Sequence, residues 1–275
     1  MSAAVVAGGG RTEPVVRLAT SGVARSFGTE QALAGVDLDL HAGEVHALVG
    51  LNGAGKTTLM RLALGMLHPD AGTVRVDVGD GPVDPVGAPS ATWGHVGHLI
   101  ETPFTYPELT VRETVRSAAR LRGLDRTAAD AATTRVLAEL ALDHWAERRA
   151  RTLSLGNRQR VGLACAVVHD PKVLVLDEPS NALDPAGVVR VRRWLADAAD
   201  RGAAVLVSSH HLDEMARVAH RITVLHRGRV LGTLDPAGAD LERQFFDMVY
   251  EEEDAVDGAP APAHTTTPTS PRSAA

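Results

Sequence analysis

The stretch at residues 50–57 carries the spacing Gly-x-x-x-x-Gly-Lys-Thr, which is typical of loops that bind phosphate groups. Glycines permit a tight turn whose backbone N–H groups face an anion at the start of a helix. We expect Lys56 to reach the β- and γ-phosphates of a nucleoside triphosphate and the Thr57 hydroxyl to bind Mg²⁺. From this stretch alone, a glycine-rich turn without function is the alternative interpretation. The residues predicted to contact the nucleotide here are Gly50, Leu51, Asn52, Gly53, Ala54, Gly55, Lys56, Thr57 and Thr58.

Lysine is rare in this chain. Lysine and arginine together number 28, and Lys56 and Lys172 are the only lysines among them. A compact ammonium group fits between phosphates where a planar guanidinium is too wide. The lysine inside the loop therefore supports the phosphate-binding interpretation.

A pair of carboxylates, Asp177 and Glu178, follows a continuous apolar run at residues 172–176. Such a run is typical of a strand buried on both faces of a parallel sheet. An acidic residue at the carboxyl end of that strand, beside a phosphate loop, is placed to bind the Mg²⁺ of the nucleotide. We expect Asp177 to bind the metal and Glu178 to polarise the water that attacks the γ-phosphate. Without the phosphate loop, the same pair would be interpreted as a solvated strand end.

These motifs need strands and helices that alternate along the chain. A buried strand at residues 44–49 leads into the phosphate loop, and a helix at 58–64 leaves it. Another buried strand is predicted at 203–207. Shorter strands are expected at residues 15–19, 36–40, 73–76, 93–101, 221–226 and 229–231, and further helices at 155–168, 212–219 and 238–250.

Two helix starts are marked by capping residues. Thr110 and Glu113 form a capping box, which opens a helix within the helical stretch at 104–152. Asp184 precedes Pro185, which predicts a second helix that extends to about residue 200.

Composition limits the possible classes of function. The 275 residues carry a net charge of −6 with both signs mixed, which gives no general case for nucleic-acid binding. Cys165, the single cysteine, lies in an apolar run and is expected to be a buried thiol of a cytosolic protein. We expect no signal peptide and no membrane span, so any work at a membrane would need a partner.

Three further motifs follow in order. Residues 153–159 read Leu-Ser-Leu-Gly-Asn-Arg-Gln, residues 180–184 read Ser-Asn-Ala-Leu-Asp, and residues 208–210 read Ser-Ser-His. Taken alone, Ser154 is a helix cap. With the phosphate loop (Walker A) and the acidic strand end (Walker B), the set resembles the ATP-binding subunit of an ABC transporter over residues 15–235.

The resemblance implies an α/β fold: a P-loop NTPase with a mainly parallel core sheet, an N-terminal antiparallel β subdomain and an inserted α-helical subdomain. It implies a flexible tail at 1–14, a nucleotide-binding domain at 15–250 with a helical insert at about 104–165, and a disordered tail at 251–275.

The resemblance also implies that two subunits close head to tail around two ATP molecules. Ser154 and Gly156 of one chain would meet the nucleotide of the other, and Asp184 would lie at the same interface. His210 would contact the γ-phosphate, with His211 as its local rival. Phe27 would lie under the adenine ring; the alternative is a core aromatic.

The chain departs from the family pattern at three positions. Leu155 replaces a signature glycine, Asn157 replaces the signature glutamine, and Glu101 stands at the Q-loop position, where a glutamine is usual. As a carboxylate, Glu101 is expected to bind the metal together with Thr57 and Asp177. These variants are similar to those of bacitracin-type, lantibiotic-immunity and daunorubicin-type drug exporters, which favours export.

The resemblance implies an ATPase that binds ATP and Mg²⁺ at the cytoplasmic face of the membrane. Its partners would be a separate permease and a second ATPase subunit, identical or paired, with no nucleic acid. The alternatives are a non-transport ATPase of the same family that acts on ribosomes or nucleic acid, and another P-loop enzyme such as a small-molecule kinase.

Overall fold

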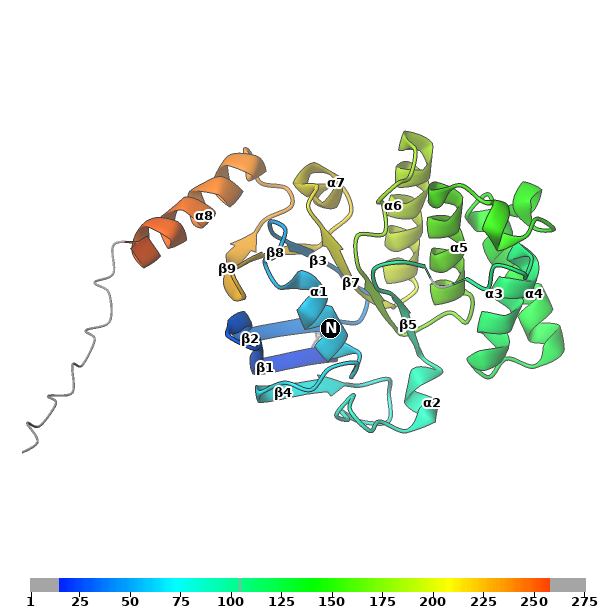
Figure 1. Ribbon diagram of the computed structural model, residues 1–275, viewed down its shortest axis with the longest axis horizontal. Coiled ribbons are helices and arrows are strands. Elements are labelled where there is room, and N and C mark those ends of the chain that lie inside the picture. Colours follow the sequence, from blue (N-terminus) through cyan, green and yellow to red (C-terminus); the bar gives the residue numbers. More distant parts are fainter. Residues whose placement is uncertain (1–14, 104, 258–275) are drawn as a thin grey trace, which may run out of the picture.

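The computed structural model describes residues 15–103 and 105–257 (Figure 1). The predicted tail at 1–14 and the part of the predicted C-terminal tail from 258 onward lie outside these residues. Within them, two sheets and a group of helices form the molecule. The larger sheet has six strands in the order β5-β6-β7-β3-β8-β9, and the smaller one has three strands in the order β2-β1-β4.

The six-stranded sheet is parallel except for its last strand. Its strands are β3 (Val45–Val49), β5 (Val96–Leu99), β6 (Val173–Leu176), β7 (Ala204–Ser209), β8 (Arg221–His226) and β9 (Arg229–Leu234). The strands β3, β6 and β7 are buried along their whole length, as predicted for the buried strands at residues 44–49, 172–176 and 203–207. Because β3, β5, β6 and β7 are parallel, the segments that follow them emerge at one edge of the sheet.

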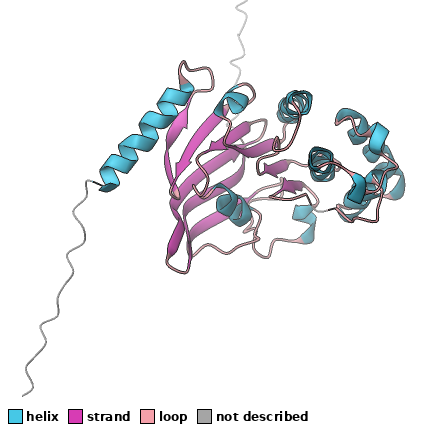
Figure 2. Cartoon of the chain, turned by 45° about the horizontal axis from the view of Figure 1, so that its top comes forward, coloured by secondary structure: helices cyan, strands magenta, loops and turns pink. Residues whose placement is uncertain are grey.

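Alternate residues of the central strands belong to two cores on opposite faces of the sheet. On β3, Ala47 and Val49 pack in one core, and Leu48 packs in the other. The first core includes α5 (Leu155–Val167) and α6 (Pro185–Asp200), which lie side by side in Figure 1. The second core includes α1 (Lys56–Ala63) and the antiparallel sheet. The view in Figure 2 shows helices on both sides of the strands.

The antiparallel sheet consists of β1 (Val16–Phe27), β2 (Glu30–His41) and β4 (Ala71–Val76). Both β1 and β2 are longer than the sequence predicts. Their pairing shifts register at several points, among them the segment around Gly22, whose φ is +58°. Such irregularities interrupt the alternation of apolar and polar residues by which a strand is recognised in a sequence.

A helical region lies at the end of the molecule opposite the antiparallel sheet (Figure 1). It contains α3 (Val111–Leu121), α4 (Arg126–Glu139) and the short 3₁₀ turns η1 (Asp143–Trp145) and η2 (Ala150–Thr152), followed by α5. The predicted capping box is confirmed: the Thr110 side chain accepts from the Glu113 backbone N–H, and the Glu113 carboxylate accepts from the Thr110 backbone N–H. Arg122, at the end of α3, donates to the Trp93 carbonyl and so ties this region to the core.

The remaining helices are α2 (Ser90–Trp93), α7 (Leu212–Ala216) and α8 (Leu241–Asp257). The prediction of disorder from residue 251 is wrong for residues 251–257, which continue α8. Glutamate favours helices, so the acidic run does not end the helix. The Glu253 carboxylate also lies 3.4 Å from Arg227 and 3.6 Å from His226.

Candidate functional site

The phosphate loop joins β3 to α1 through backbone that only glycine accommodates. Gly55, the residue before α1, has a φ of +105°. A Cβ atom there would lie 2.6 Å from the Ala32 carbonyl oxygen, and one at Gly50 would lie 2.2 Å from the Leu225 carbonyl oxygen. Both glycines are therefore needed for the loop to pack against its neighbours.

Lys56 points back into the loop that precedes it. Its Nζ atom donates to the carbonyl oxygens of Gly50 at 2.6 Å and Leu51 at 3.2 Å, and lies 4.0 Å from Glu178 Oε1. Burial lowers the pKa of Lys56, against the opposing effect of Glu178 and Asp177. The ammonium group is thus held by acceptors within the loop, beside the two carboxylates that the sequence singles out.

Asp177 is buried and is bonded to two hydroxyl groups. Thr57 Oγ1 donates to its Oδ2 atom at 2.7 Å, and Ser208 Oγ donates to its Oδ1 atom. A hydroxyl beside a carboxylate supplies the hard oxygen ligands that Mg²⁺ prefers. Among the described residues no group of three or more His, Cys, Asp and Glu side chains is placed to hold a metal. Mg²⁺ bound through nucleotide phosphates needs only one or two protein carboxylates, so Thr57 and Asp177 fit it.

Glu178 is held by both its backbone and its side chain. Its φ is +48°, a left-handed conformation that is rare for residues other than glycine. Its N–H donates to Ser208 Oγ at 2.9 Å, and its Oε2 atom lies 2.9 Å from His210 Nδ1. The rings of His210 and His211 are 3.9 Å apart, and only His210 bonds to Glu178. The structure thus brings together the predicted base and the predicted γ-phosphate sensor.

Ser208 is a site residue that the sequence names only as part of the Ser-Ser-His motif, with no role predicted for it. It is completely buried at the end of β7 and bonds to both Asp177 and the Glu178 backbone. Its only signal in the sequence is a serine that ends an apolar strand shortly before His210.

A cavity of about 320 Å³ joins the loop to the two carboxylates and to Phe27. The Phe27 side chain is exposed at its rim, with the Arg25 guanidinium 5.1 Å from the ring centroid. The exposed ring of Phe27 can stack on a nucleotide base at this rim. The alternative interpretation of Phe27 as a core aromatic is wrong. The lining consists of Phe27, Glu30, Ala32, Asn52, Gly53, Ala54, Gly55, Lys56, Thr57, Thr58, Asp177 and Glu178.

Glu101 does not line this cavity. It follows β5 with a φ of +58°, and its carboxylate forms an ion pair with Arg61 of α1. The carboxylate that is predicted to bind the metal is therefore paired with an arginine in this structure. Its role toward Mg²⁺ stays a prediction.

The signature residues also lie outside the cavity. Ser154 caps α5 by accepting from the Asn157 N–H, and Asp184 caps α6 by accepting from the Gly187 N–H. A Cβ atom at Gly156 would lie 2.5 Å from the Ala182 carbonyl oxygen. The glycine thus permits α5 to approach the 180–184 segment of the same chain.

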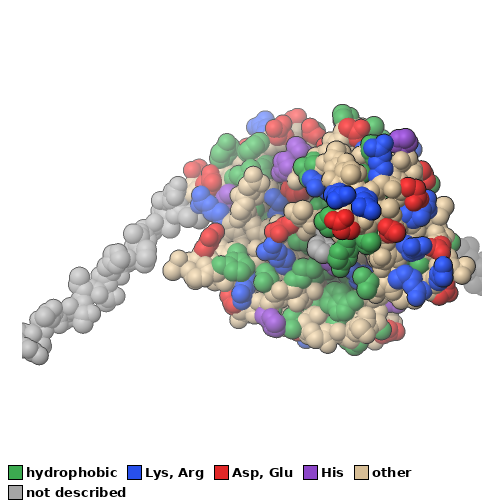
Figure 3. Space-filling model, turned by 45° about the vertical axis from the view of Figure 1, so that its right-hand side comes forward, with side chains coloured by type: hydrophobic (Ala, Val, Ile, Leu, Met, Phe, Trp, Pro, Cys, Tyr) green, Lys and Arg blue, Asp and Glu red, His purple; other side chains and the backbone are tan. Residues whose placement is uncertain are grey.

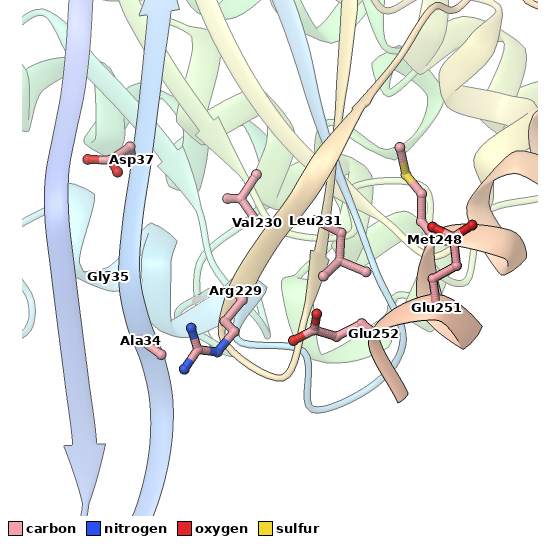
Figure 4. A pocket seen from close by; sticks show the side chains of 9 residues that line it. All are labelled: Ala34, Gly35, Asp37, Arg229, Val230, Leu231, Met248, Glu251 and Glu252. Carbon is pink, nitrogen blue, oxygen red and sulfur yellow. The ribbon is translucent and has the colours of Figure 1, made fainter. Parts of the chain in front are cut away.

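One further groove in the surface contains none of the predicted site residues. A groove of about 580 Å³ lies between β2, β9 and α8, and the side chains of Arg229 and Glu252 are among those that line it (Figure 4). The face in Figure 3 mixes acidic and basic side chains. Across the described residues, no helix is both long and apolar enough to span a bilayer.

Comparison with known proteins identifies relatives of the chain. A family model described as ABC transporter matches residues 33–181. The chain is 33% identical over 213 residues to the bacitracin transport ATP-binding protein BcrA of Enterococcus faecalis, a match that covers 77% of this chain and 67% of that protein. It is 36% identical over 230 residues to the ribose import ATP-binding protein RbsA 2 of Streptomyces avermitilis, which covers 81% of this chain and 44% of that protein. The chain thus spans less than half the length of the ribose import relative.

A solved structure described as the ATP binding subunit of an ABC transporter matches with a TM-score of 0.75 and 28% identity. The match covers 86% of this chain and 98% of that one. The predicted fold class, an α/β core with an antiparallel β subdomain and a helical region, is thereby confirmed.

Proposed function

The chain belongs to the ABC transporter family and is an ABC transporter ATPase, and from this premise we propose that it drives export of a drug, an antibiotic or a peptide through a separate membrane permease. The observation that carries the chemistry is the contact between His210 and Glu178 beside the Lys56 loop. It places the carboxylate proposed as the base between the loop lysine, 4.0 Å away, and a histidine, 2.9 Å away.

The polar side chains at the site each have a proposed task. When ATP binds, the Lys56 ammonium group gives up its bonds to the loop carbonyls and binds the β- and γ-phosphates. Thr57 and Asp177 hold Mg²⁺, which supplies charge neutralisation for the phosphates. Glu178 accepts a proton from the attacking water, and His210 keeps its carboxylate in position.

The site is proposed to be completed by a second subunit. Ser154 and Gly156 do not line the cavity of their own chain. At the N-terminus of α5, the backbone N–H groups and the Ser154 hydroxyl are suited to a phosphate. We therefore assign these residues, with Asp184 nearby, to the nucleotide of the partner subunit. Hydrolysis then requires two subunits to close, either identical or paired.

Export is supported by two observations. The family includes BcrA, a bacitracin transport protein two thirds of whose length this chain matches, whereas the match spans less than half of the ribose import relative. The departures at Leu155 and Glu101 are also similar to those of drug and peptide exporters. ATPase subunits of this family work with transmembrane partners, so we place the chain at the cytoplasmic face of the membrane, bound to a permease.

Two measurements test this proposal. The tagged chain should retain a polytopic membrane protein when purified from detergent-solubilised membranes, and a partnerless chain with full activity would contradict it. A strain in which Glu178→Gln replaces the native chain should become sensitive to peptide antibiotics or cationic drugs. A growth defect confined to one nutrient, with unchanged drug resistance, would indicate import instead.

A further inference from the structure

The ion pair between Arg61 and Glu101 lies close to the predicted magnesium ligands. Thr57 and Arg61 are four residues apart on α1 and therefore lie on the same face of the helix. Thr57 bonds to Asp177, which follows β6, and Arg61 bonds to Glu101, which follows β5. The same helix thus contacts the ends of two adjacent strands, one turn apart.

The two strand ends are joined directly. The N–H of Asp177 donates to the Leu99 carbonyl at 2.7 Å, and Glu101 is two residues beyond Leu99. Glu101 therefore lies only two residues from Leu99, which is bonded to the proposed metal ligand Asp177. Its left-handed backbone differs from the extended conformation of the strand before it, and its side chain is turned to Arg61.

The ion pair is accessible to solvent. The Arg61 and Glu101 side chains are 36% and 55% exposed. An ion pair that is this exposed changes an equilibrium constant by about fivefold at most. A divalent cation beside Glu101 can therefore compete with Arg61 for the carboxylate.

We propose that Arg61 is a positioning residue that holds Glu101 away from the metal, and that Mg²⁺ bound with nucleotide competes with Arg61 for this carboxylate. The inference rests on the magnesium site proposed above. It explains how a carboxylate is tolerated at the Q-loop position: Arg61 neutralises it when no metal is bound. Glu101 then has two alternative partners, Arg61 and the metal.

A double-mutant cycle tests the competition without measuring turnover. The purified chain is titrated with Mg²⁺ at a fixed concentration of a non-hydrolysable ATP analogue, and the half-saturating Mg²⁺ concentration is read from nucleotide binding. Arg61→Gln should lower this concentration by about three- to fivefold, because Glu101 loses its competing partner. Glu101→Gln should raise it, and Arg61→Gln added to Glu101→Gln should then change it by less than about twofold.

The control is Arg112→Gln, which breaks an ion pair of similar exposure between Arg112 and Glu147 in the helical region. It should leave the Mg²⁺ titration unchanged. Arg61→Lys, which keeps the charge, should stay within about twofold of the native chain, and a thermal melt of each variant checks folding.

An equal effect of Arg61→Gln in the native chain and in the Glu101→Gln variant would overturn the inference, because Arg61 would then act only through its own charge. No effect in either background would overturn it as well. If nucleotide binding by the native chain does not depend on Mg²⁺, the proposed magnesium site itself fails, and that result is distinct from the other two.

Discussion

Ser208 offers a direct test of how the site is held together, because one hydroxyl contacts both acidic residues. It donates to Asp177 Oδ1 and accepts from the Glu178 N–H at 2.9 Å. The residue is completely buried, so no solvent replaces either bond in Ser208→Ala. The substitution removes one oxygen atom and leaves the strand otherwise unchanged.

The expected cost follows from the two bonds. A hydrogen bond to a carboxylate contributes about 1.5–3 kcal/mol and a neutral one about 0.5–1.5 kcal/mol, so Ser208→Ala should lower the free energy of unfolding by about 2–4.5 kcal/mol. If the bond to the Glu178 backbone also positions the base, its loss should slow ATP turnover by up to about tenfold. Urea denaturation measures the first quantity, and steady-state phosphate release measures the second.

Ser209→Ala is the matched control. Ser209 is the next residue of β7 and is equally buried, but its hydroxyl accepts one bond, from the His211 N–H at 2.9 Å. This variant should lose only about 0.5–1.5 kcal/mol of unfolding free energy. If both variants lose the same stability and turn over ATP at the native rate, the assigned role of Ser208 is refuted.

Three further predictions concern other parts of the chain. Glu178→Gln should bind ATP but lose turnover by about 100-fold or more, and gel filtration with ATP should show a dimer; a native rate would exclude Glu178 as the base. Gly156→Ala places a methyl group 2.5 Å from the Ala182 carbonyl oxygen. Turnover should fall at unchanged nucleotide affinity, whereas Leu155→Ala should bring no such clash. Burial, with a nearby arginine, lowers the pKa of His98 from 6.5 to about 4. Between these values the unfolded chain binds more protons, so stability rises with pH, by up to about 3 kcal/mol. His98→Asn should reduce the rise between pH 5 and pH 7 in urea melts, and an unchanged slope would contradict the prediction.

The parts of the site that the sequence predicts are those carried by contiguous motifs. The loop at 50–57 and the carboxylates after residue 176 each follow a buried strand, and a parallel sheet brings such strand ends to one edge. The long strands β1 and β2 are only partly predicted, because half-exposed antiparallel strands with shifts in register lack a continuous apolar pattern.

The contacts that the sequence does not predict join segments far apart in the chain. Ser208 bonds to Asp177 across 31 positions, and Arg61 bonds to Glu101 across 40. Neither serine nor arginine has a spacing rule relative to these partners. The position of Glu101 in a motif assigns it to the metal, and the competing arginine becomes visible only when α1 is placed beside the end of β5.

The two halves of the proposed site are physically linked within one chain. Gln159, on the helix that begins after Ser154, is buried, and its side-chain amide donates to the carbonyl oxygens of Glu178 at 3.3 Å and Pro179 at 3.4 Å. The helix proposed to contact the nucleotide of the partner therefore also holds the backbone of the base in its own cavity. Glu178 occupies a left-handed conformation, so its backbone depends on such supporting contacts, and we expect a shift of α5 to change the position of this residue. Closure on one nucleotide is thereby expected to alter the base that acts on the other, which would give a physical reason for the proposed requirement for two subunits.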